Sequence, residues 1–296
     1  MKRYFFSLVI LLSGISMSYS QVTSDSRPMI TGVQPALVLQ LKGADPKFVE
    51  TKWKEFTKNY GKVEKVKGSK ESVIQGIHIG EIGGGELMNV YSYSAQASDG
   101  TELTVWFSRG GNYLTSKEPE YAKAEHFLKS FAIKVNADMI ALDLEAQQKK
   151  LEKLESAQAK LVKENENLHK IIADNNAKIE QAHTDIPLNE RSQEVSKADI
   201  ANQKAVVESV KDNPEEYKLQ QKLLAKLEST DEKLKKENAS LHKVVADSEA
   251  KIKQAELDIT ANLEAQATTQ AQIEEQEKVV ELVTTKYNEA KSKKPE

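Results

Sequence analysis

The chain has 296 residues, of which 39% are hydrophobic and 29% charged, with 42 basic residues, 45 acidic residues and no cysteine. The slight acidic excess argues against binding to nucleic acid or to an anionic membrane surface, because basic patches recognise both. The lack of cysteine excludes disulfides and a lipidated N-terminal cysteine.

Residues 1–20 have the composition of a cleaved secretion signal. Lys2 and Arg3 form a basic start, an apolar stretch follows, and small residues lead to Ser20, just before Gln21. The apolar stretch is too short to span a membrane. We therefore expect an exported protein, periplasmic or extracellular, that is cleaved near Ser20–Gln21 and keeps no transmembrane anchor. Cleavage would leave 40 basic residues against 45 acidic ones, a net charge of −5.

We expect the next part of the chain to form a small globular domain. Residues 21–35 are predicted to be a flexible lead-in, since they contain Ser, Asp, Pro, Gly and Thr. Residues 36–135 can bury one modest core, and we expect an α+β head with the order β-α-β-β-β-β-α and a mostly antiparallel sheet. The expected elements are a strand at 36–41, a helix at 46–60, strands at 62–67, 72–82, 87–97 and 102–108, and a helix from residue 119.

Three aromatic residues on two of these strands form a candidate ligand platform. Asp99-Gly100 predicts a two-residue hairpin turn, which would set Tyr93 opposite Trp106 with Tyr91 on the same face. An exposed aromatic platform stacks sugars or clamps peptides. The alternative is that this aromatic pair only stabilises the sheet or meets a helix.

The rest of the chain contains an internal sequence repeat. The stretch from Lys153, KLESAQAKLVKENENLHKIIADNNAKIEQAHTDI, returns from Lys226 as KLESTDEKLKKENASLHKVVADSEAKIKQAELDI, an offset of 73 residues. Apolar residues in both copies follow a heptad, with position a at Leu151 in the first copy and at Leu224 in the second. Such a sustained heptad predicts a coiled coil.

The two copies are predicted to form an antiparallel hairpin over residues 136–296. An offset of 73 is not a multiple of seven, so one uninterrupted seam is impossible, and Asn213-Pro214 has the residues of a helix start. We expect arms at 136–212 and 214–292 with a turn near residue 213. Pro187 predicts a kink in the first arm; the alternative is a chain reversal there, which would give a three-helix bundle.

Four asparagines are predicted to set the register of this hairpin. A turn at residue 213 places Asn165 level with Asn262 and Asn189 level with Asn238, all at seam positions. A buried amide needs a hydrogen-bonding partner, so amides that meet inside the seam would select one alignment of the arms.

Apolar residues at position g, beside the seam, form a candidate oligomer stripe: Ile171 and Val206 in the first copy, and Val244 and Val279 at the same places in the second. They either pair two hairpins into a four-helix dimer or shield the core of one hairpin.

Nothing in the sequence supports catalysis, a cofactor or a metal site, because no nucleophile, His and carboxylate set has a recognisable spacing. We expect an exported, non-catalytic protein in which the hairpin is a spacer or oligomerisation arm for the head, with protein partners that include a second copy. In outline the architecture resembles cell-envelope adaptors and tentacled periplasmic chaperones. The alternative is a binding module whose head captures a glycan or peptide, with the rod presenting it or acting as a chaperone-like arm.

Overall fold

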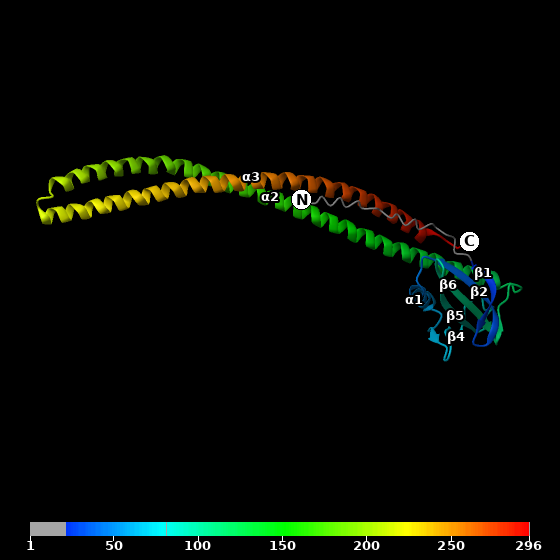
Figure 1. Ribbon diagram of the computed structural model, residues 1–296. Coiled ribbons are helices and arrows are strands. Elements are labelled where there is room, and N and C mark those ends of the chain that lie inside the picture. The colour runs from blue at the N-terminus through cyan, green and yellow to red at the C-terminus, as the bar shows by residue number, and fades with distance from the viewer. Residues whose placement is uncertain (1–21, 81, 296) are drawn as a thin grey trace. The chain divides into compact units, whose positions relative to one another are not determined.

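The computed structural model describes residues 22–80 and 82–295 (Figure 1). The predicted secretion signal lies outside the described residues. The chain divides into two compact units. Unit 1 contains the residues up to Gln148 together with those from Lys278 onward, and unit 2 contains Lys149–Glu277.

Unit 1 is built on a seven-stranded sheet in which every described strand pair is antiparallel. The strand order is β1-β2-β6-β5-β4-β3, and β7 pairs with β6. The strands are β1 (Val22–Met29), β2 (Gly32–Lys42), β3 (Glu64–Lys65), β4 (Ser72–Ile77), β5 (Met88–Ala97), β6 (Gly100–Arg109) and β7 (Asn112–Tyr113).

The predicted flexible lead-in at 21–35 was wrong, because the structure forms β1 and the start of β2 there. Gly32, with a φ of 105°, permits the tight turn after Met29, and β1 then pairs with β2 along its whole length. Six of the eight β1 residues are polar or proline, so their local pattern does not identify a strand. The backbone hydrogen bonds to β2 make it one. The short β7 was also not predicted.

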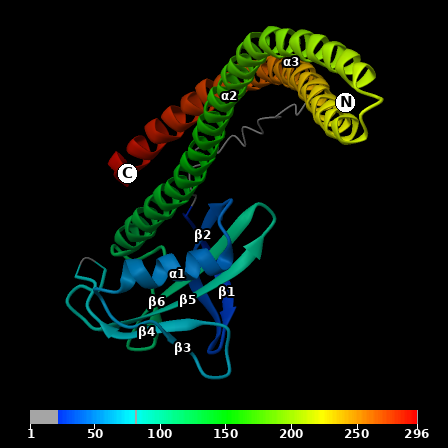
Figure 2. The ribbon, with the colours of Figure 1, turned by 90° about the vertical axis from the view of Figure 1, so that its left-hand side faces the viewer.

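Two helices cover one face of the sheet, as Figure 2 shows for α1 (Pro46–Thr57). Asp45 caps α1, and its side chain accepts hydrogen bonds from the backbone N–H groups of Lys47 and Phe48. Trp53 of α1 packs edge-on against Phe131 of α2 (Tyr121–Ser209), with ring centroids 5.0 Å apart. The centre of this core is fully buried and contains Leu39, Val49, Leu103, Phe107, Leu128 and Phe131.

The two long helices, α2 and α3 (Pro214–Ser292), pack against each other as an antiparallel hairpin (Figure 1). The turn is where it was predicted: α2 ends at Ser209, and Asn213 precedes Pro214 at the start of α3. The backbone oxygen of Asn213 accepts the first helical hydrogen bond, from Tyr217 N at 2.8 Å. Two acidic residues, Glu215 and Glu216, occupy the first turn, where they complement the helix dipole.

Within unit 2 the burial of side chains follows the predicted heptads on both arms. Polar contacts between the arms include those of Gln193, which donates to the carbonyl of Leu234 at 3.3 Å, and of Gln203, which donates to the Gln220 side chain at 2.7 Å. Lys204 also pairs with Glu228 at 3.4 Å. These contacts establish the antiparallel direction of the two arms.

The predicted alternative of a reversal at Pro187 was wrong, because α2 continues through this residue. A proline inside a helix removes one backbone donor but does not have to end the helix when packing on both sides maintains it. Its neighbours Ile186 and Asn189 are both seam residues, half-buried and buried respectively. The kink at this position stays a prediction.

The end of α3 belongs to unit 1, where it packs against the part of α2 that follows the head. Val283 and Ala290 form a buried cluster with Ile140, and Tyr287 packs against it. Across the stretches that the structure describes, no helix combines the length and apolar character needed to cross a membrane.

Candidate functional site

Tyr91 and Tyr93 of β5 and Trp106 of β6 lie on the sheet face opposite to the helices. Tyr91, not Tyr93, is paired with Trp106, so the predicted register was wrong by two residues. The hairpin turns at Ser98-Asp99, and Gly100 is already the first residue of β6, paired with Ala97 and with Lys42 of β2. Because side chains alternate between the two faces of a strand, a register shift of two residues leaves each side chain on its predicted face. The three aromatic residues therefore still lie on one side of the sheet.

Trp106 lies underneath this aromatic group and is only 1% exposed, against Met29 and Ala36. Tyr91 and Tyr93 are half-buried and pack against the Trp106 cluster, together with Tyr113 of β7. A ligand could therefore reach the tyrosines but not the face of the tryptophan. Tyr113, whose ring centroid is 6.4 Å from that of Tyr91, was missed because it follows a two-glycine turn that the sequence analysis did not use.

Polar side chains cover the same face next to Tyr93. The guanidinium of Arg27 on β1 lies 3.1 Å from the Glu102 carboxylate on β6, so this ion pair passes over the intervening β2. Gln40 donates to the same carboxylate at 2.9 Å. The tyrosines and this charged group together form a mixed aromatic and polar surface, which we call the tyrosine face.

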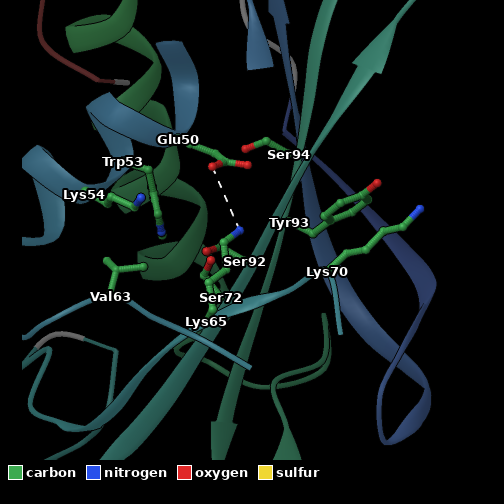
Figure 3. A pocket seen from close by; sticks show the side chains of 10 residues that line it. All are labelled: Glu50, Trp53, Lys54, Val63, Lys65, Lys70, Ser72, Ser92, Tyr93 and Ser94. Carbon is green, nitrogen blue, oxygen red and sulfur yellow. Dashed lines mark ion pairs between the residues drawn. The ribbon is translucent and has the colours of Figure 1, made fainter. Parts of the chain in front are cut away.

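A second polar feature lies on the helix side of the sheet. Ten residues line a shallow pocket between α1 and strands β4 and β5, which encloses room for about one water molecule (Figure 3). In this view the side chains of Tyr93 and Lys70 extend away from Trp53. Glu50 and Lys65 form an ion pair at 4.0 Å across the pocket. The serines of its floor, Ser72, Ser92 and Ser94, are all buried.

The predicted register asparagines all lie in the seam of unit 2. Asn189 and Asn262 are buried, and Asn165 and Asn238 are half-buried. Among the described residues, no Asn–Asn hydrogen bond crosses the seam. Asn262 instead donates to the Glu164 carboxylate at 3.3 Å, one residue from the predicted partner Asn165.

Two glutamines occupy equivalent places in the repeat beside these asparagines. Gln193 donates to Asn189 at 2.6 Å, and Gln266 donates to Asn262 at the same distance. Gln193 also reaches the backbone of the opposite arm at Leu234. Part of the contact between the arms is therefore made through glutamines that the sequence analysis did not single out, although their equivalent spacing in both copies could have revealed them.

The four residues of the candidate oligomer stripe fall in two different units of the structure. Ile171, Val206 and Val244 belong to unit 2 and are 42%, 40% and 38% exposed. Val279 is in unit 1, where it packs against the cluster of Ile140 and Val283. Two residues that were not predicted, Leu219 and Leu223, are 60% and 45% exposed within one turn of the Gln203–Gln220 contact. Val206 lies one turn from the same contact.

No protein-family model matches this chain, and no curated protein shows significant similarity to it. The assignment of function therefore depends on the residues and their geometry.

Proposed function

We propose that the protein is an exported, non-catalytic structural or assembly component of the cell envelope. In this proposal the helical hairpin is the oligomerisation arm that carries the small head domain. The observation that carries it is the exposure of Ile171 and Val244, which occupy the same place in the two copies of the repeat and lie on opposite arms.

The repeat gives this exposed stripe an approximate symmetry that fits a second copy of the same chain. In an antiparallel pair of helices, position g of one arm lies on the same side as position g of the other, so Ile171 and Val244 share one flank. A two-fold dimer uses the same patch on both subunits and therefore needs a self-complementary surface. Exposed isoleucine and valine on such a flank favour the burial of apolar area between two hairpins.

Sedimentation velocity of the purified chain at micromolar concentration tests this proposal. We expect a dimer for the wild type and a monomer for the double variant Ile171→Lys/Val244→Lys, because two buried lysines per subunit would oppose association. Leu257→Lys is the matched control: Leu257 is 59% exposed and lies at position f, away from the seam and its flanks. The control should remain a dimer. A monomeric wild type would contradict the proposal.

Export is tested separately by fractionation of cells that produce the native gene product, followed by N-terminal sequencing. Mature protein that begins at or near Gln21 in the exported fraction is the expected result. A cytoplasmic protein that retains Met1 would contradict it.

A second candidate function is capture of a glycan or peptide by the head. The tyrosine face supports it, since half-buried Tyr91, Tyr93 and Tyr113 lie beside the Arg27–Glu102 pair. Aromatic rings beside charged hydrogen-bonding groups are a common composition of sugar and peptide sites.

Array screening with immobilised oligosaccharides and peptides, followed by titration of any hit, tests this second function. Tyr93→Ala should weaken binding at least tenfold. Tyr60→Ala, which truncates a 40% exposed tyrosine outside this face, should not. Equal affinity of both variants would exclude the tyrosine face as the site.

A further inference from the structure

We infer that the hairpin of unit 2 has a separable end, in which the two arms part as one segment while the stretch before it stays paired. This segment, which we call the hairpin end, is residues 189–238: the last part of α2, the turn and the first part of α3. The inference concerns the seam between the arms, so it depends neither on the exposed flank nor on the tyrosine face.

The first observation is a run of polar residues where the hairpin end begins. With the turn at residue 213, three successive layers of the seam are Asn189 with Asn238, Gln193 with Leu234, and Ser196 with Asp231. The hydrogen bond from Gln193 to the Leu234 carbonyl agrees with this alignment. Asn189, Gln193, Ser196 and Asp231 are all less than 10% exposed. Two of the three layers therefore contain no apolar side chain.

The second observation is that this polar run is incompletely hydrogen-bonded. Oδ1 of Asp231 and Oδ1 of Asn238 are buried, and no described residue donates a hydrogen bond to either. Lys235 pairs only with the other carboxylate oxygen of Asp231. Water can solvate these groups once the arms part, so their burial disfavours the closed state.

The stretch that precedes the hairpin end has at least one Leu, Ile or Val in every layer. With the same alignment its layers are Leu168–Ile259, Ile172–Ala255, Asn175–Ile252, Ile179–Ser248, Ala182–Val245 and Ile186–Leu241. The smaller residues of this stretch, Asn175, Ala182, Ser248 and Ala255, are at most 4% exposed. The apolar burial in each layer favours pairing, so this stretch stays closed.

The repeat contains the same polar run a second time, on the head side of the hairpin. Its layers are Asn165 with Asn262, Leu161 with Gln266, and Gln158 with Thr269. In unit 1 the same two helices are joined again by the cluster of Ile140, Val283 and Ala290. The head-side run thus lies between two apolar stretches, whereas the hairpin end leads only to the turn. Only the hairpin end can therefore part without breaking an apolar stretch beyond it.

Parting of the arms changes the surface of the rod. Ile200, Leu224 and Leu227 are half-buried in the closed seam and become accessible when the arms separate. Val206 and Leu219, which are already 40% and 60% exposed, lie in the same segment. The open state thus exposes apolar surface that the closed hairpin hides.

Hydrogen–deuterium exchange of the full-length protein, followed by mass spectrometry, tests the inference. Residues 193–203 are compared with their repeat equivalents 266–276, and residues 228–238 with 155–165, after correction for intrinsic exchange rates. A helix that has lost its partner is only marginally stable, so its amides exchange when the arms part. We expect exchange at least tenfold faster in the hairpin end, with a common protection across it. Equal exchange in the equivalent segments, or a smooth rise towards the turn, would overturn the inference.

Variants of one layer show whether the polar run is the cause. Ser196→Leu/Asp231→Leu makes a polar layer apolar and should slow exchange of the hairpin end at least tenfold. Gln158→Leu/Thr269→Leu changes the equivalent layer on the head side and should leave the hairpin end unchanged. Both pairs are also measured with Ile171→Lys/Val244→Lys, so that protection by a dimer is not mistaken for closure. The inference is wrong if neither pair, or both pairs equally, slow the exchange of the hairpin end.

Discussion

Replacement of Asp231 should stabilise the hairpin, although this residue takes part in an ion pair. Asp231 lies in the seam and is 6% exposed; one carboxylate oxygen lies 2.7 Å from Lys235 Nζ, and the other is buried without a partner. A buried charge with only one satisfied oxygen has a desolvation cost that its ion pair does not fully offset. Ser196, which a turn at residue 213 places level with Asp231 on the other arm, is a small buried residue.

For Asp231→Leu we expect the free energy of unfolding to rise by about 1–3 kcal/mol, from the lost desolvation cost and the added apolar burial. The melting temperature measured by circular dichroism at 222 nm should rise by several degrees. Glu232→Leu is the matched control, because Glu232 also contacts Lys235 but its side chain is 62% exposed; its effect should stay within about 0.5 kcal/mol. A lower melting temperature for Asp231→Leu with an unchanged control would refute the reasoning.

Three further predictions concern the register, the alkaline stability and the head. Nitroxide labels at 165 and 262 should be separated by less than about 2 nm in pulsed electron paramagnetic resonance, since packed helices lie close together; a separation of many nanometres would exclude the antiparallel pairing. The hydrogen bonds of Lys235 to Asp231 and Glu232 raise the pKa of this lysine above its ordinary value of 10.5, so their stabilisation is present below pH 10.5 and is lost as the pH rises beyond it. Alkaline melting curves should show this loss in the wild type but not in Lys235→Met. Gly100→Ala should destabilise the head by at least about 2 kcal/mol, because φ is +156° and the added Cβ would overlap the carbonyl oxygen of Leu41, whereas Gly80→Ala, in open space, should change stability little.

Some strands of the head could be predicted from the sequence and others could not. The hydrophobic alternation of β2, β5 and β6 identified them, because side chains that face a core repeat every second residue. β1 lacks this signal, since it is an edge strand held by the backbone of β2. The hairpin register of β5 and β6 was predicted from Asp99-Gly100 alone, but pairing of Gly100 with Lys42 on β2 draws this glycine into the sheet.

For the polar residues of the candidate sites, the sequence predicted some positions but not their hydrogen-bonding partners. The seam positions of Asn189 and Asn262 followed from the heptad, but their partners are Gln193, Gln266 and Glu164, because long side chains reach around a neighbouring layer. The pocket around Trp53 had no signal at all. Trp53 looked like an ordinary core residue of an amphipathic helix, but the pocket that it lines also contains three serines from β4 and β5.

The sequence by itself determined the hairpin: the heptads, the phase slip between the copies and the Asn213-Pro214 start are all local signals, and an antiparallel pair of arms is the arrangement that satisfies them together. Only the tertiary structure decided which polar groups are left without partners, because that depends on where strands, helix and turn meet in space. Both polar features of the head, the tyrosine face and the shallow pocket at Trp53, arise from this second kind of information.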